Sequence, residues 1–424
     1  MSETVTAGEL QEAPDGPKPV RIGLLGRGNV GAAFAELLAE RAEAVEAATG
    51  RRPELSGVLT RSAGDFEEIL ERSDLIVELM GGTEPARDYA IAAMRAGRPF
   101  VTANKQLLAQ HGDELFQIAR ESGVQLRFEA AVAAVIPIVR TIQEGFAATE
   151  IEKVYGIVNG TTNFILSEMA ASGAGYEETL ARAQELGYAE ADPTDDVSGA
   201  DAAAKMAILA RLAFHTPVTL SEVTYEGIEG ITPDDLAFAK ELGLSLKLLG
   251  VAERRGGAIS VRVFPCFLYS GHPLAPIEGA FNAVMIQADA INEVTLSGPG
   301  AGGLQTASAV LGDVVSILAG DAPVHETRTE LPIVADVPSS FYLHLEVADQ
   351  PGVLARIATV LGDHEVSVKS VVQRGFGEDA RLVMVLHECV ESRFARAVEA
   401  LNELGELRAP ARSIHVIEEA YKAE

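Results

Sequence analysis

The sequence predicts an α/β protein with three folded parts: a parallel, doubly wound sheet, an α+β domain with a mixed sheet, and a small ferredoxin-like unit. Short apolar runs alternate with helical patterns in the first part, and helices mix with strands in the second. The order β-α-β-β-α-β closes the chain. The expected boundaries are a disordered tail at 1–19 and domains at 20–137, 138–335 and 338–424.

The first domain is predicted from alternation, and the tail before it from composition. The tail is polar, acidic and rich in Pro and Gly, which is typical of disordered chain. Apolar runs predict strands, and the helical patterns between them predict the helices of a parallel sheet. The expected strands are 20–26, 54–60, 74–81, 98–103 and 124–132, and the expected helices are 32–48, 86–97 and 113–123.

The second and third parts have different patterns. A linker, VADVPSS at 334–340, separates them. The second part should contain helices 136–146, 164–173, 176–187 and 199–214 and strands 152–158, 259–268 and 292–298. The third part should contain, in order, strand 341–347, helix 353–364, strands 366–375 and 380–388, helix 392–404 and strand 413–419.

Composition excludes several classes of function. The chain has 62 acidic and 34 basic residues, a formal net charge of −28, which argues against nucleic acid or an anionic membrane as partner. Two cysteines, Cys266 and Cys389, provide neither a disulfide framework nor a cysteine zinc site. No apolar run reaches membrane-spanning length, and no basic-then-apolar signal opens the sequence. We therefore expect a soluble cytoplasmic protein.

The segment RIGLLGRGNVGAAF predicts a dinucleotide site. It carries Gly26, Gly28 and Gly31 in G-x-G-x-x-G spacing, directly after a strand and at the start of a helix. Glycines allow backbone N–H groups to approach a pyrophosphate, and the helix N-terminus favours its charge. Three glycines can also simply form a tight turn, but the alternating βαβ context favours a Rossmann-type domain. The predicted cofactor residues are Gly26, Arg27, Gly28, Asn29, Val30 and Gly31.

Two further residues are predicted to lie near the cofactor. The second strand ends at Leu59-Thr60-Arg61, where an acidic residue would bind the ribose of NAD, so Arg61 favours the 2′-phosphate of NADP. Arg27 could add to this preference, and NAD stays open. Lys105, in TANKQLL, follows a strand on the carboxyl side of the sheet and either faces the nicotinamide or is an exposed lysine at a helix start.

The stretch EADPTDDVSGADAAAK, 190–205, crowds five carboxylates before a lysine. Its spacing matches an EF-hand poorly, and no histidine lies nearby to complete a transition-metal site. A small cationic substrate fits better. Asp201 and Lys205, four residues apart on a helix, share one face, either as an acid–base pair or as an ordinary salt bridge.

Seven motifs, in order along the chain, resemble homoserine dehydrogenases. They are GLLGRGNVG, ELMGG-EPAR, TANK, EAAVAAVIP, NGTTNFIL, GYAEADPTDDVSGADAAAK and GPGAGGLQTASAV. The resemblance runs from about residue 20 to 335. The terminal unit, with ADQPGVLARIA at 348–358, resembles an ACT domain, the amino-acid-sensing module that many members of that family carry.

The resemblance implies NAD(P)-dependent interconversion of L-aspartate 4-semialdehyde and L-homoserine, in the pathway to threonine, methionine and isoleucine. Glu190 and Asp196 would hold the amino-acid end of the substrate, and Asp201, Lys205 and Lys105 would lie at the reacting centre. Lys205 is the first choice as proton donor and Lys105 the second. The segment NGTTN, 159–163, is either a turn with a helix cap or a direct contact.

The resemblance also implies a sodium ion held by the main chain of Glu129, Val132, Ala134 and Ile136. Here the chain departs from the family, which usually has several glycines where Ala133, Ala134 and Val135 stand. A Cβ costs energy at any of these positions that needs a positive φ. A second departure is a short connection between Arg61 and Asp74, which weakens the inference of NADP.

The ACT-like unit implies feedback inhibition, by threonine first of all. In DQPGVLARIATVL, Pro351-Gly352 turns the chain into a helix whose free N–H groups would bind the amino acid, usually across a dimer interface. We therefore expect a homodimer or homotetramer. The alternatives are an oxidoreductase acting on another amino-acid aldehyde, a catalytically inactive sensor, or an ACT unit that only dimerises.

Overall fold

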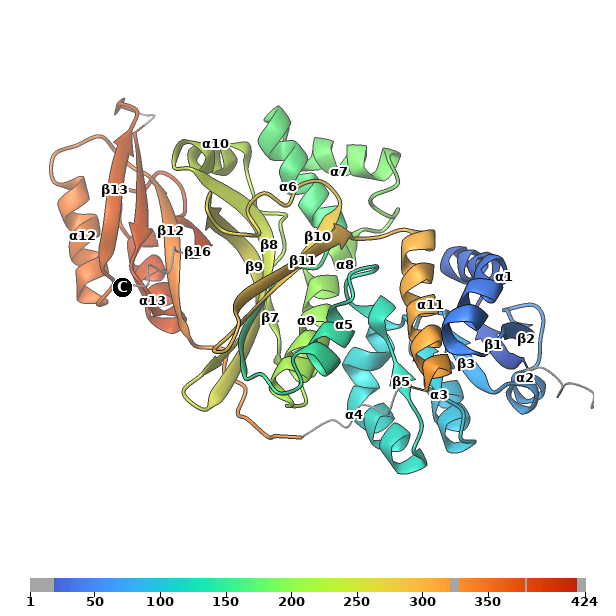
Figure 1. Ribbon diagram of the computed structural model, residues 1–424. Helices are drawn as coiled ribbons and strands as arrows, with labels where there is room; N and C mark the ends of the chain where they lie inside the picture. Colours follow the sequence, from blue (N-terminus) through green and yellow to red (C-terminus); the bar gives the residue numbers. More distant parts are fainter. Residues whose placement is uncertain (1–18, 321–327, 378–379, 418–424) are drawn as a thin grey trace, which may run out of the picture.

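The computed structural model describes residues 19–320, 328–377 and 380–417. Its three parts follow one another along the molecule, with the N-terminal sheet at one end and the C-terminal unit at the other (Figure 1). The predicted disordered tail, apart from Pro19, lies outside the described residues.

The N-terminal part is the expected α/β domain. Its five parallel strands have the order β2-β1-β3-β4-β5. Because the strand order reverses between β1 and β3, a crevice opens at their carboxyl ends. The strands are β1 Val20–Leu25, β2 Pro53–Leu59, β3 Leu75–Glu78, β4 Phe100–Thr102 and β5 Leu126–Arg127, and the helices are α1 Asn29–Thr49, α2 Phe66–Arg72, α3 Ala86–Arg95 and α4 Lys105–Ser122.

Several local expectations differ from the structure. The linker predicted at 334–340 already contains the start of a strand, β12, Pro338–Glu346. The strand predicted at 124–132 is only β5, because the chain turns into a 3₁₀ segment, Glu129–Ala131. The helix predicted at 113–123 begins at Lys105, since Asn104 caps it by accepting the N–H of Leu107. The helix predicted at 136–146 is a short α5, Ile138–Arg140, that continues as a π-helical segment, Thr141–Gly145.

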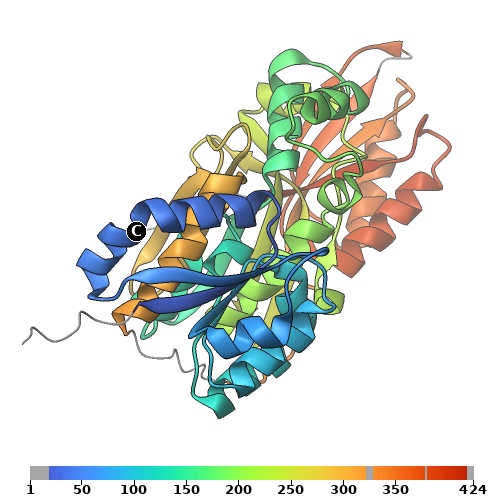
Figure 2. The same ribbon diagram turned by 90° about the vertical axis from the view of Figure 1, so that its right-hand side faces the viewer.

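A helix that sequence patterns missed completes the N-terminal domain. Helix α11, Gly303–Ala319, falls within the stretch 138–335 but packs beside α1 on the N-terminal sheet (Figure 2). Its Val310 and Val314 share a core with Ile22 and Phe34, while α2, α3 and α4 cover the opposite face. The cofactor-binding unit is thus assembled from two separate parts of the chain.

The middle part and the C-terminal unit share one sheet. Eleven strands take part, nine of them in the order β11-β10-β6-β8-β9-β16-β12-β14-β13. The two parts join where β16 pairs in parallel with β9, His415–Ile417 against Cys266–Leu268. The middle part contains β6 Ile151–Ile157, α6 Gly160–Ser172, α7 Tyr176–Glu185, α8 Thr194–Val197, α9 Ala200–Phe214, a 3₁₀ segment Leu220–Glu222, β7 Thr224–Tyr225, α10 Pro233–Glu241, β8 Leu244–Arg255, β9 Ala258–Tyr269, β10 Phe281–Ala288 and β11 Asn292–Pro299.

The C-terminal unit has the expected β-α-β-β-α-β order. An extra short strand, β15, pairs with the start of β12. The elements are β12 Pro338–Glu346, α12 Val353–Asp363, β13 Val368–Arg374, β14 Arg381–Leu386, β15 Cys389–Val390, α13 Glu391–Asn402 and β16 Arg412–Ile417. Within the described residues, none of the helices combines the length and the apolarity needed to cross a membrane.

The packing of α11 gives a stability prediction. Leu318 is 2% exposed in the core that α11 shares with the N-terminal sheet, whereas Leu304, on the same helix, is 59% exposed. Leu318→Ala should lower the free energy of unfolding by about 2–5 kcal/mol, because it removes buried methyl groups and leaves a cavity. Leu304→Ala is the control and should change it far less. Equal effects in urea denaturation would contradict the assignment of α11 to this core.

A buried lysine gives a prediction about pH. Lys247 of β8 is 3% exposed and donates to the carbonyl oxygen of Ile277. Burial lowers the pKa of Lys247 to about 8, whereas an unfolded lysine titrates near 10.4. The unfolded chain therefore binds more protons between these two values, so this group makes the free energy of unfolding rise with pH there.

The rise due to Lys247 should reach up to about 3 kcal/mol between pH 8 and pH 10.4. Below pH 8 both states are protonated and the cost of burying the charge is fully present. Lys247→Met should remove this rise in chemical denaturation at pH 8 and pH 10. Parallel pH profiles for the variant and the unaltered protein would show that Lys247 is not destabilised by burial.

Candidate functional site

The glycine loop after β1 leaves an open space where an anion can bind. Gly26 has φ +96°, and a Cβ there would lie 2.6 Å from the carbonyl oxygen of Leu79; a Cβ on Gly31 would lie 2.1 Å from that of Gly26. These two glycines are needed by the protein's own packing. A Cβ on Gly28 would meet no atom within 4 Å. Helix α1 has neither a side-chain cap nor an acidic residue in its first turn, so its N–H groups fit a pyrophosphate.

The other predicted cofactor residues surround this loop. Asn29 begins α1, and its side-chain oxygen would lie 2.8 Å from a Cβ on Gly303, so the start of α11 abuts the loop. Arg27 and Arg61 are exposed, and neither has a hydrogen bond or ion pair to another described residue. Both guanidinium groups are therefore available to a ligand.

A buried network fixes the ends of β3 and β4. The carboxylate of Glu78 accepts from Thr102 Oγ1 and from the N–H of Met80, both at 2.6 Å, and burial raises its pKa. Asn104 donates to the carbonyl oxygen of Gly82 at 2.6 Å while it caps α4. Lys105, the first residue of α4, is thereby held at the carboxyl edge of the sheet.

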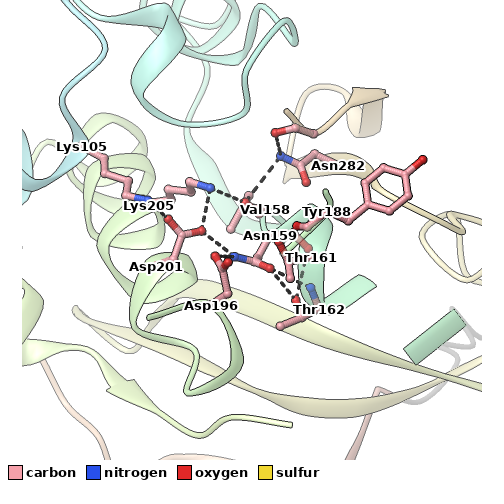
Figure 3. A network of polar contacts seen from close by, with 11 residues as sticks. Lys105, Val158, Asn159, Thr161, Thr162, Tyr188, Asp196, Asp201, Lys205 and Asn282 are labelled. Carbon is pink, nitrogen blue, oxygen red and sulfur yellow. Dashed lines mark hydrogen bonds and ion pairs between the residues drawn. The ribbon is translucent and has the colours of Figure 1, made fainter. Parts of the chain in front are cut away.

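The side chain of Asp201 is the centre of the site (Figure 3). It is 2% exposed and lies in the first turn of α9. Its Oδ1 accepts from Lys105 Nζ, and its Oδ2 accepts from Lys205 Nζ at 2.7 Å and from Asn159 Nδ2 at 2.7 Å. Two domains and three chain segments therefore meet at one carboxylate.

The electrostatics keep this centre ionised. Burial by itself disfavours the charged form of Asp201, but Lys205 and Lys105 outweigh it and hold the pKa of Asp201 well below its usual range. Burial likewise disfavours the charged form of Lys105, yet the charge of Asp201 outweighs this and raises the pKa of Lys105. Lys205 also donates to the carbonyl oxygen of Val158 at 2.8 Å.

Asn159 bridges the buried Asp201 and the half-buried Asp196. It ends the segment after β6 and caps α6, because its Oδ1 accepts from the N–H of Thr162 at 2.8 Å. Its Nδ2 donates to Asp196 Oδ1 and to Asp201 Oδ2, each at 2.7 Å. The cap fixes the orientation of the amide, since a flipped amide would aim an oxygen at two carboxylates. Burial raises the pKa of Asp196.

The structure brings together Lys105, Asp196, Asp201 and Lys205, but it leaves Glu190 apart from their hydrogen bonds. Glu190 is exposed, and its carboxylate makes no hydrogen bond or ion pair within the described ranges. For the segment NGTTN, a helix cap and a direct contact were both left open, and Asn159 does both: it caps α6 and donates to Asp196 and Asp201. It was not among the predicted site residues. A polar residue between a buried strand and a helix was the available signal.

A cleft of about 270 Å³ lies beside this network. Gly81, Gly82 and Asn104 border it on the N-terminal sheet, and Lys105 and Lys205 border it beside Asp201. Residues to which sequence analysis gave no role complete it. They are Ala103, Gln106, Ala130, Ala131, Gly300, Ala301 and Thr306. Val132 and Ala134 of the predicted sodium segment border the cleft as well.

The segment predicted to hold sodium forms part of this cleft. Ala134 has φ +51°, which is a left-handed backbone conformation. Glycine, which the family usually has here, adopts this conformation at little cost, whereas the Cβ of alanine makes it unfavourable. Val132 and Ala134 are buried, and no backbone N–H in the described part of the chain donates to their carbonyl oxygens. Buried carbonyls without donors are uncommon, and such oxygens fit a small cation. The carbonyl of Ile136 already accepts the N–H of Ile138 at 2.8 Å.

Comparison with known proteins agrees with the motifs. Residues 26–129 match the family model "Homoserine dehydrogenase, NAD binding domain", residues 137–315 match "Homoserine dehydrogenase", and residues 342–406 match "ACT domain". A homoserine dehydrogenase of Mycobacterium tuberculosis is 41% identical over 92% of this chain and 96% of its own. The chain belongs to the homoserine dehydrogenase family.

Solved structures of the family have the same fold. A homoserine dehydrogenase from Thiobacillus denitrificans superposes with a TM-score of 0.90 at 36% identity, over 95% of this chain and 99% of its own. A hyperthermophilic archaeal member, solved in complex with NADPH, gives a TM-score of 0.63 at 27% identity over 73% of this chain and 100% of its own. The predicted family, the fold class and the ACT unit are thus confirmed, and the chain is an NAD(P)-dependent oxidoreductase of this family.

The bridge made by Asn159 gives a prediction that separates capping from positioning. Aspartate and serine both cap helices well, but neither can donate from the position of Nδ2 to two carboxylates. Asn159→Asp and Asn159→Ser should each lower kcat/KM for homoserine roughly 10–100-fold, the equivalent of one lost charge-assisted hydrogen bond. The aspartate variant should also shift the pH profile, because it adds a third carboxylate. Near-normal steady-state kinetics for both variants would show that Asn159 only caps α6 and does not position the two carboxylates.

Proposed function

We propose that the chain catalyses the NAD(P)-dependent interconversion of L-aspartate 4-semialdehyde and L-homoserine. The observation that supports this most is the carboxylate of Asp201, buried between Lys105 and Lys205 at the edge of the cleft. Oxidation of an alcohol or reduction of an aldehyde needs one proton to move to or from the oxygen. Two lysines held beside one carboxylate at a dinucleotide cleft suit that task.

Lys205 is the proposed proton donor in the reductive direction. Two of its three N–H bonds are directed at Asp201 and at the carbonyl oxygen of Val158, which leaves one for the substrate oxygen. The nicotinamide, when bound, supplies or accepts the hydride. Lys105 also borders the cleft, and its ammonium would stabilise negative charge on the same oxygen. Asp201 keeps both lysines in place and balances their charge.

The acids beside this centre are proposed to bind the amino group of the substrate. Asp196 is half-buried next to Asp201, and Asn159 fixes the position of its carboxylate. An ammonium group near Asp196 would offset the cost of burying that charge. Glu190 would reach the same group from the exposed loop. This proposal explains why five carboxylates can lie within a stretch of 12 residues, from Glu190 to Asp201.

The cofactor and ion preferences are extensions of this proposal. Exposed Arg27 and Arg61 near the glycine loop support NADP over NAD, since a 2′-phosphate needs cationic partners. Main-chain oxygens of Glu129, Val132, Ala134 and Ile136 would hold a sodium ion beside the cleft, which would satisfy the buried carbonyls there. The ACT unit is proposed to sense an amino acid, threonine first of all, in a cytoplasmic homodimer or homotetramer.

One assay tests the reaction itself. Purified protein should reduce NADP, and more slowly NAD, in a homoserine-dependent manner, and should oxidise NADPH with aspartate semialdehyde. Other amino-acid aldehydes and their alcohols serve as controls for substrate class. Absence of any homoserine-dependent signal with both cofactors would overturn the proposal.

Replacement of the two lysines tests their roles. Lys205→Ala should lower kcat by at least about 100-fold, the lower limit of typical general-acid contributions, while NADPH still binds. Lys105→Ala should cost less if Lys205 is the donor. Lys240→Ala, an exposed lysine on α10, is the control. A larger loss for Lys105→Ala than for Lys205→Ala would exchange the two roles.

A further inference from the structure

The segment that joins β5 to α5 forms one wall of the cleft beside Lys205. It leads the chain from the N-terminal domain to the middle part, and Ala130, Ala131, Val132 and Ala134 border the cleft. Ala134 lies in the left-handed region, with φ +51°. Strained backbone persists only where the surrounding structure over-determines it. The contacts that hold this segment therefore decide the shape of the wall.

The side chain of Glu129 closes this segment into a loop. Its Oε1 accepts the N–H of Val139 at 2.7 Å, and its Oε2 accepts the N–H of Arg140 at 2.9 Å. Val139 and Arg140 lie in the first turn of α5, where N–H groups have no acceptor within the helix. Because Glu129 is only 5% exposed, water competes little for these bonds. One side chain thus holds the two ends of the loop together.

Asp313 connects this loop to α11. Its Oδ2 accepts the N–H of Glu129 at 2.8 Å, and the residue is 2% exposed. Arg140 returns to the same helix, because its Nη2 donates to the carbonyl oxygen of Gly312 at 3.2 Å and lies 3.7 Å from Asp313 Oδ1. Both ends of the loop are therefore attached to α11, which belongs to the core of the N-terminal domain.

Hydrogen bonds within the loop do not replace this attachment. The N–H of Ala131 donates to the carbonyl oxygen of Phe128, and the N–H of Ile136 donates to that of Ala133, so both bonds are local. Ala130 packs in the same core as α11, but apolar contact is not directional. The hydrogen bonds of Glu129 therefore fix an orientation of the wall that apolar packing does not.

We propose that Asp313 is a positioning residue for the reaction, and that it acts through Glu129 to keep the loop 130–136 in the conformation that receives substrate and nicotinamide. Helix α11 also starts beside the glycine loop, where Gly303 abuts Asn29. One helix therefore holds the cofactor loop and the cleft wall at a fixed separation. This inference rests on the reaction proposed above, and it gives Asp313 no contact with the substrate.

Single-turnover kinetics separate positioning from stability. Full-length protein in excess over NADPH is mixed with saturating L-aspartate 4-semialdehyde, so that the observed rate constant does not depend on the folded fraction. Asp313→Ala should lower this rate constant roughly 10–100-fold, because a displacement of about 1 Å in a site can cost up to roughly 100-fold. The dissociation constant for NADPH should change far less.

Two further variants serve as controls. Leu318→Ala removes apolar packing of α11 and none of these hydrogen bonds, so it should lower the free energy of unfolding and leave the rate constant unchanged. Asp313→Asn retains an oxygen that can accept the N–H of Glu129, so it should recover most of the rate lost in Asp313→Ala. A role in stability alone would leave Asp313→Ala and Leu318→Ala with the same rate constant.

A rate constant for Asp313→Ala close to that of the unaltered protein would overturn the proposal. If Asp313→Ala does not fold, Glu129→Gln decides, because an amide nitrogen cannot accept the second N–H of α5. That variant should slow the same step, and an unchanged rate constant would overturn the proposal. Failure of the unaltered protein to oxidise NADPH with the semialdehyde would instead overturn the proposed reaction, and this inference with it.

Discussion

The site depends on one buried ion cluster, the carboxylate of Asp201 between two lysines. A charge taken out of water costs several kcal/mol unless partners surround it, so this carboxylate is stable only when all its partners are in place. Lys105 comes from the N-terminal domain, Lys205 from the helix of Asp201, and Asn159 from the end of β6. The contacts that keep Asp201 ionised therefore also fix the position of the N-terminal domain relative to the middle part at the cleft.

Three residues of this cluster lie at or next to the N-terminus of a helix. Lys105 starts α4, Asn159 starts α6, and Asp201 lies in the first turn of α9. Helix starts also provide free N–H groups and favour negative charge, which suits both a pyrophosphate at α1 and a carboxylate at α9. Helix α11 then returns from the middle of the chain to the N-terminal sheet, and its first residues border the cleft. The start of α11 thus lies beside the glycine loop, through Gly303 and Asn29, and beside the cleft, through Thr306.

Sequence patterns predicted the parts that depend on local spacing. The glycine loop and the pair Asp201–Lys205 follow from the geometry of a turn and a helix. The expected energy cost of an alanine at a positive φ applies at Ala134, where φ is +51°. Contacts across the chain were not predictable in this way. Nothing local places α11 on the N-terminal sheet, and a single asparagine gives no sign that it will touch both Asp196 and Asp201. For Glu190 the motif predicted a role that the hydrogen bonds of the structure do not include, because its carboxylate joins none of them.

The charge of Asp201 is the most direct point to measure. Asp201→Asn keeps the shape of the side chain and removes the charge on which both lysines depend. If the account is right, kcat/KM for homoserine falls by at least about 100-fold in this variant, while the melting temperature in the presence of NADPH still rises as it does for the unaltered protein. A variant that turns over homoserine at a near-normal rate would contradict the central role of this carboxylate.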